Sequence, residues 1–149
     1  MNGRYKIEIK YRDIYYILDI KRKFTIVTGE TGSGKTSLCE LLNERLKYNN
    51  KFVKFRAEYP IKFTNYLDGV LSINKTEKCF VFLDEGEYLK HPDLNEYIRY
   101  TNAYYVIFSR YPVKSLSGSI VEVCELGDSH KDGLNCKVLV PYLESSHHE

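Results

Sequence analysis

Tryptophan is absent from this chain of 149 residues, methionine occurs once, and there are only four prolines and four cysteines. No two of the cysteines form a C-x-x-C pair, the spacing that most zinc sites in short sequences need. A zinc site is therefore not expected. We predict that the thiols are reduced and partly buried, as is usual inside cells. The four positions are Cys39, Cys79, Cys124 and Cys136.

Long apolar runs and a strong excess of one charge are also missing. No run approaches the roughly 20 apolar residues that cross a bilayer, and the first residues contain no apolar stretch typical of a signal peptide. The formal net charge is only +2, so charge gives no support for a nucleic-acid or membrane-surface partner. These absences predict a cytoplasmic protein without membrane insertion.

A glycine-rich stretch after an apolar run is the most informative feature present. Gly29, Gly34, Lys35 and Thr36 match the pattern G-x-x-x-x-G-K-[ST], between a strand-like and a helix-like segment. Such glycines let backbone N–H groups surround phosphate oxygens at a helix N-terminus. Lysine then reaches the β- and γ-phosphates, and the threonine hydroxyl holds Mg²⁺. The predicted nucleotide-binding residues are Gly29, Glu30, Thr31, Gly32, Ser33, Gly34, Lys35, Thr36 and Ser37.

Apolar patterning indicates an α/β fold with a mainly parallel sheet. Continuous apolar runs at residues 79–83 and 104–108 are typical of strands buried on both faces. Leucines at helical spacing predict a helix over residues 35–48, and Phe63 begins a second apolar stripe of this kind. Alternating strands and helices imply right-handed parallel crossovers. We also expect an N-terminal β-hairpin within residues 4–20 and an antiparallel C-terminal pair at residues 120–126 and 136–140.

Polar residues follow three of the predicted strands. They are Thr28, the pair Asp84 and Glu85, and the pair Ser109 and Arg110. The carboxyl ends of parallel strands meet at one edge of a sheet, which is where ligands bind. Asp84 is expected to hold Mg²⁺ together with a threonine hydroxyl of the glycine-rich stretch. Glu85 is positioned in the sequence to polarise a water molecule for attack on the γ-phosphate.

The segments Gly29–Thr36 and Phe80–Glu85 together resemble the P-loop NTPases of the additional-strand, catalytic-glutamate division, which includes the AAA-type ATPases. The resemblance covers residues 22–126 and implies a three-layer P-loop NTPase fold. It also implies that strand 104–108 lies between the loop strand and the Asp84 strand. In that division, a polar residue at the end of this strand senses the γ-phosphate. Ser109 matches by position, and Arg110 is the competing candidate.

Too few residues follow the last predicted strand to build the helical lid of AAA-type ATPases, so an arginine finger is not assigned. Arg110 and Arg99 are the candidates for it. We interpret the chain as one P-loop domain, with a hairpin at 1–21, a nucleotide-binding core at 22–126, and a terminal strand and tail at 127–149.

The sequence predicts an ATP-binding protein that uses Mg²⁺ and couples ATP hydrolysis to an unidentified protein partner, with oligomers possible. A small-molecule or nucleotide kinase is one alternative, and an ATP-dependent binding module with negligible turnover is another. Residues 74–77 imitate the guanine-specifying N-K-x-D motif but end in Glu77, so GTP specificity is unsupported. The basic cluster at residues 21–23 is interpreted as a solvated loop rather than a nucleic-acid contact.

Overall fold

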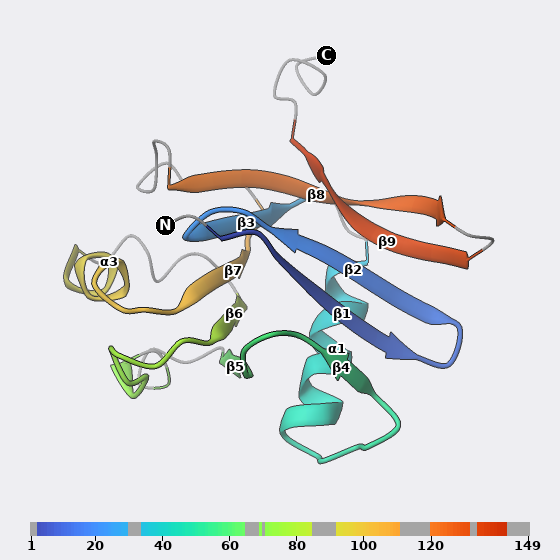
Figure 1. Ribbon diagram of the computed structural model, residues 1–149, viewed down its shortest axis with the longest axis horizontal. Coiled ribbons are helices and arrows are strands. Elements are labelled where there is room, and N and C mark those ends of the chain that lie inside the picture. The colour runs from blue at the N-terminus through green and yellow to red at the C-terminus, as the bar shows by residue number, and fades with distance from the viewer. Residues whose placement is uncertain are drawn as a thin grey trace.

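The computed structural model describes residues 3–29, 34–64, 69, 71–84, 92–110, 120–131 and 134–142. The first half contains β1 (Tyr5–Tyr11), β2 (Ile14–Ile20), β3 (Phe24–Thr28), α1 (Lys35–Leu46), β4 (Lys54–Arg56) and β5 (Ile61–Thr64). The second half contains β6 (Phe80–Asp84), α3 (Pro92–Arg99), β7 (Tyr104–Phe108), β8 (Val121–Lys131) and β9 (Leu134–Pro141). The strands form one sheet in the order β4-β1-β2-β9-β8-β3-β7-β6-β5 (Figure 1).

Strand β3 lies inside a block of parallel strands. It pairs with β7 on one side and with β8 on the other, and β6 and β5 continue the block beyond β7. All five residues of β3 and all five of β7 are buried. The continuous apolar runs therefore predicted these strands correctly. The strand at 104–108 lies between β3 and β6, as the sequence resemblance implied.

Two hairpins complete the sheet. Strands β1 and β2 pair antiparallel around a tight turn in which Arg12 has a φ of 56°. Strands β8 and β9 also pair antiparallel, over a longer register. A short parallel pairing joins the hairpins, because Tyr16 and Ile17 of β2 lie opposite Lys137 and Val138 of β9.

The predicted three-layer P-loop NTPase fold with a mainly parallel sheet is wrong. The described residues are mostly in strands, which form a mixed and strongly curled sheet of nine strands, and few of them are helical. The β2–β9 pairing makes both hairpins part of the main sheet, which adds antiparallel neighbours. The helix expected from Phe63 does not begin there, because Phe63 belongs to strand β5, but Gly69 and Leu71 further along this segment are helical. The predicted hairpin and C-terminal pair are present.

Apolar side chains of α1 share one core cluster with side chains from both halves of the curled sheet. Three leucines of the helix are buried there, which stabilises the fold by about 1.5–3 kcal/mol for each side chain. This core cluster includes Ile7, Ile9, Tyr16, Leu18, Val27, Leu38, Leu41, Leu42, Phe80, Phe82, Tyr104, Val106 and Phe108. A second cluster on the opposite face of β3, β6 and β7 includes Ile98 of α3 and Ile73.

The two edge strands are close in sequence. Strand β4 ends at Arg56 and β5 begins at Ile61, yet they occupy opposite ends of the strand order. Residues 57–60 therefore connect the two edges of the sheet, which only a curled sheet allows.

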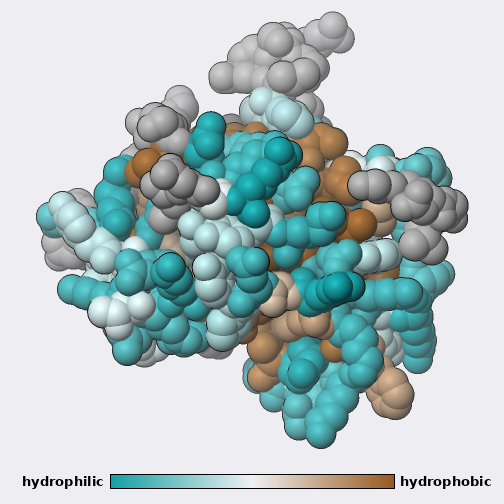
Figure 2. Space-filling view, in the orientation of Figure 1, coloured by the Kyte–Doolittle hydropathy of each residue, from teal (hydrophilic) through white to brown (hydrophobic). Residues whose placement is uncertain are grey.

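The face in Figure 2 is largely hydrophilic, with hydrophobic residues showing in separate places. Within the described parts of the chain, no helix has the length and apolar character to cross a bilayer.

Candidate functional site

The carboxyl ends of β3, β7 and β6 meet at one edge of the sheet. Phe108, the last residue of β7, lies opposite Val27 of β3 on one side and Asp84 of β6 on the other. Neighbouring strands are about 4.8 Å apart, so Asp84 and the end of β3 are separated by about 10 Å. The structure thus brings together the strand ends that carry Thr28, Asp84 and Ser109.

Two glycines frame the loop between β3 and α1. Gly29 has a φ of 132° and Gly34 a φ of 105°, in the region that residues with a side chain rarely adopt. The carbonyl oxygen of Gly34 accepts the first helical hydrogen bond, from Leu38 N at 3.0 Å. Gly34 supplies no side-chain cap, and the first turn of α1 holds no acidic residue. The first N–H groups of the helix are thus directed towards the loop without an anionic side chain in that turn.

Lys35 connects the start of the loop to the end of β7. Its Nζ donates a hydrogen bond to the Gly29 carbonyl oxygen at 2.6 Å and a longer one to the Ser109 carbonyl oxygen at 3.4 Å. Burial lowers the pKa of Lys35, and the nearby Arg110 guanidinium lowers it further, while Cys39, Asp84 and Glu125 act in the opposite direction. The positive charge of Arg110 therefore acts on the Lys35 ammonium, and a bound anion would reduce this repulsion.

Backbone and side-chain bonds fix the end of β7 beside the end of β3. Ser109 N donates to the Val27 carbonyl oxygen at 3.0 Å. The Thr28 hydroxyl donates to the Arg110 carbonyl oxygen, also at 3.0 Å, and Thr28 is 1% exposed. Ser109 is half-buried and Arg110 is exposed. Both residues are thus held at the edge that the sequence predicted for them.

The two predicted Mg²⁺ ligands differ in exposure. Thr36 lies exposed in the first turn of α1, and Asp84 is half-buried at the end of β6. The described residues contain no cluster of three or more His, Cys, Asp or Glu side chains suited to a metal. Mg²⁺ is commonly bound through one or two carboxylates plus phosphate and water oxygens. One hydroxyl and one carboxylate fit this chemistry.

Several predicted positions lie outside the described residues. They are Glu30, Thr31, Gly32, Ser33 and Glu85. Ser37 is described and exposed next to Thr36. Arg99 ends α3 and is also exposed.

Residues from both hairpins also reach the loop, and sequence reasoning missed them. The Tyr16 hydroxyl on β2 donates to the Gly34 carbonyl oxygen at 2.9 Å. A methyl group placed on Gly34 would lie 3.4 Å from Cε of Lys137 and 3.5 Å from the Tyr16 hydroxyl. Glu125 on β8 lies opposite Thr28. No local motif marks these residues; only the β2–β9 and β3–β8 pairings bring them to the loop.

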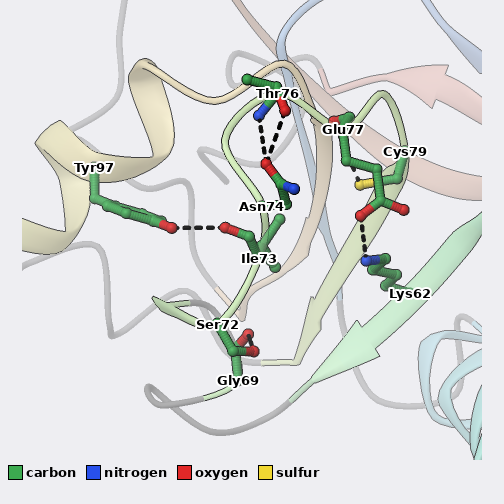
Figure 3. Close-up of polar contacts among 9 residues, drawn as sticks. All are labelled: Lys62, Gly69, Ser72, Ile73, Asn74, Thr76, Glu77, Cys79 and Tyr97. Carbon is green, nitrogen blue, oxygen red and sulfur yellow. Dashed lines mark hydrogen bonds and ion pairs between the residues drawn. The ribbon is translucent and has the colours of Figure 1, made fainter.

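The guanine-like segment performs a structural role at the other edge of the sheet. Asn74 Oδ1 accepts hydrogen bonds from Thr76 N at 3.0 Å and from Thr76 Oγ1 at 2.8 Å, which closes a turn before β6 (Figure 3). The Tyr97 hydroxyl donates to the Ile73 carbonyl oxygen at 2.7 Å, and Glu77 pairs with Lys62 at 2.7 Å. The Asn74 oxygen is therefore engaged within its own turn.

The basic cluster before β3 is not a fully solvated loop. Lys23 is only 6% exposed, and its Nζ donates a hydrogen bond to the Thr101 carbonyl oxygen. The ammonium also lies 5.6 Å from the centre of the Tyr105 ring. Burial lowers the pKa of Lys23 to about 8. The residue therefore belongs to the interior of the protein.

The cysteines agree with the sequence prediction. All four are free thiols, three of them buried and Cys39 half-buried. Burial raises the pKa of Cys39 to about 12, so this thiol stays protonated although it lies near Lys35.

No known protein-family model matches the chain, and a search of curated proteins found no match to it.

Proposed function

We propose that this chain binds ATP with Mg²⁺ and hydrolyses it, using the loop between β3 and α1 as the phosphate site. The observation that carries the proposal is the position of Lys35. Its ammonium lies between the Gly29 and Ser109 carbonyl oxygens, beside the cationic Arg110. A polyphosphate would replace two neutral acceptors with negative charge and would relieve the repulsion between the cations.

Each residue of the candidate site has a proposed role in ATP binding or hydrolysis. Lys35 and the first N–H groups of α1 bind the phosphates, and Thr36 with Asp84 holds Mg²⁺. The metal, when bound, neutralises charge on the phosphate oxygens. Glu85 is the proposed base that orients the attacking water. The strand order β3-β7-β6 separates the loop strand from the Asp84 strand by one strand, which is the single feature of strand order that the resemblance implied and the structure has.

Nucleotide binding is tested first, by calorimetric titration of the purified protein with Mg·ATP. Lys35→Ala should weaken binding by about 10- to 100-fold, the effect of losing a charged hydrogen-bonding partner. The matched control is Lys47→Ala, which removes an exposed lysine just beyond the other end of α1. Equal affinity of the Lys35→Ala variant and the wild type would overturn the proposal.

Turnover is tested by phosphate release. Glu85→Gln should retain ATP affinity and lose hydrolysis, because the amide cannot accept the proton of the water. A wild type that binds ATP but releases no phosphate, with or without cell extract, would reduce the proposal to ATP binding alone. The ATP-loaded Glu85→Gln variant is also the form in which to capture the proposed protein partner.

A further inference from the structure

Lys137 lies against the last glycine of the loop, although it comes from the C-terminal hairpin. It pairs in register with Tyr16, whose hydroxyl bonds to Gly34. Its Cε is 3.4 Å from the position that a methyl group on Gly34 would occupy. The Lys137 ammonium is one bond beyond that carbon. The Lys137 ammonium therefore lies near the N-terminus of α1, where the phosphates of the proposed nucleotide would lie.

The present partner of this ammonium is a solvent-exposed carboxylate. Lys137 Nζ lies 2.8 Å from Asp128 Oδ1, and the two residues are opposite each other on β9 and β8. The Asp128 side chain is 76% exposed and that of Lys137 is 31% exposed. Ion pairs so open to water stabilise proteins little and are readily exchanged. Lysine also has a flexible stem with rotatable donors, which suits a change of partner.

We propose that Lys137 is a phosphate-responsive lysine, which leaves Asp128 and contacts the nucleotide phosphates when the loop is occupied. The inference rests on the proposed function, since it needs a nucleotide in the loop. A triphosphate carries several negative charges and lies at the positive end of α1, whereas Asp128 offers a single hydrated charge. Nucleotide binding in the loop would therefore break the Lys137–Asp128 ion pair between β9 and β8.

Two variants separate this role from a purely structural one. Lys137→Met and Asp128→Asn break the same ion pair, so a structural role changes nucleotide affinity in the same direction in both. The proposal instead predicts opposite changes. Lys137→Met removes the phosphate contact and weakens Mg·ATP binding about fivefold, and Asp128→Asn frees the lysine and tightens it about twofold. Lys137→Arg keeps the charge and should restore most of the affinity.

The experiment is calorimetric titration of all four proteins with Mg·ATP and with AMP, after their melting temperatures are measured without ligand. The Lys137→Met effect should be lost with AMP, which lacks the β- and γ-phosphates. Unchanged ATP affinity in Lys137→Met, or changes of the same sign in both variants, would overturn the inference while leaving the proposed function in place. If the wild type binds no ATP, that result refutes the proposed function and, because the inference depends on it, the inference as well.

Discussion

The rings of Tyr5 and Tyr104 are 5.0 Å apart, centre to centre, although four strands separate β1 from β7 in the sheet. In a flat sheet this separation would be about 24 Å. Tyr5 also contacts Phe80 and Tyr59, at 5.8 Å and 5.3 Å. The contact across the sheet is therefore a direct sign of its curl, and it links the N-terminal hairpin to the strands that carry the candidate site.

Removal of this aromatic link should loosen the curl. Tyr5→Leu deletes three ring contacts, each worth about 0.5–1.5 kcal/mol beyond burial, so we expect a loss of about 2 kcal/mol in the free energy of unfolding. The measurement is urea denaturation. Tyr15→Leu is the control and should cost less, because Tyr15 lies on the same hairpin but has no ring–ring contact with another described residue. A Tyr5→Leu protein as stable as the wild type would contradict this account of the curl.

Two threonines on β3 provide a matched pair. Thr28→Val deletes the hydroxyl that bonds to the Arg110 carbonyl oxygen and should lower the free energy of unfolding by about 1 kcal/mol. The hydroxyl of Thr25 is equally buried but has no hydrogen-bond partner among the described residues. Thr25→Val should therefore be neutral or stabilising. Denaturant unfolding of both variants checks the prediction, and equal losses would count against it.

The Tyr16 hydroxyl should matter for both stability and nucleotide affinity. Tyr16→Phe removes a hydrogen bond to the Gly34 carbonyl oxygen at a cost of about 1 kcal/mol, and it frees the end of the loop. We expect weaker ATP binding as a result. Tyr15→Phe is the control, because the Tyr15 hydroxyl bonds to Glu8 on the neighbouring strand. That variant should lose stability without losing affinity, and the reverse pattern would exclude a role for Tyr16 at the loop.

Stability should depend on pH through Lys23. Its pKa is lowered from 10.5 to about 8 in the folded protein, so the unfolded chain binds more protons between these values. The free energy of unfolding therefore rises with pH across this window, by up to about 3 kcal/mol from this residue. The difference between wild type and Lys23→Met, measured at pH 7.5 and 9.5, isolates the contribution. Lys51→Met, on an exposed lysine, should not change the pH dependence.

Sequence patterns predicted the buried strands well, because β3, β6 and β7 are buried on both faces and read as continuous apolar runs. The edge that carries Asp84 and Ser109 followed from those strands. The helical stripe was placed too early at Phe63, which lies in β5, whereas Gly69 and Leu71 are helical; a short apolar segment fits a strand or a helix equally well. The β2–β9 pairing was not predictable, because a parallel contact between distant segments has no local pattern. Tyr16 and Lys137 were missed for that reason.

The strand order has a consequence for the order in which the chain becomes structured. The loop and α1 lie in the first third of the sequence, but β3 gains its neighbours only from β7 and β8, and Gly34 gains Lys137 only from β9. A growing chain emerges from the ribosome with its N-terminal end first. Strand β3 and Gly34 therefore acquire all these neighbours only when the C-terminal hairpin has been made. The many distant pairings favour slow folding, on a scale of milliseconds to seconds.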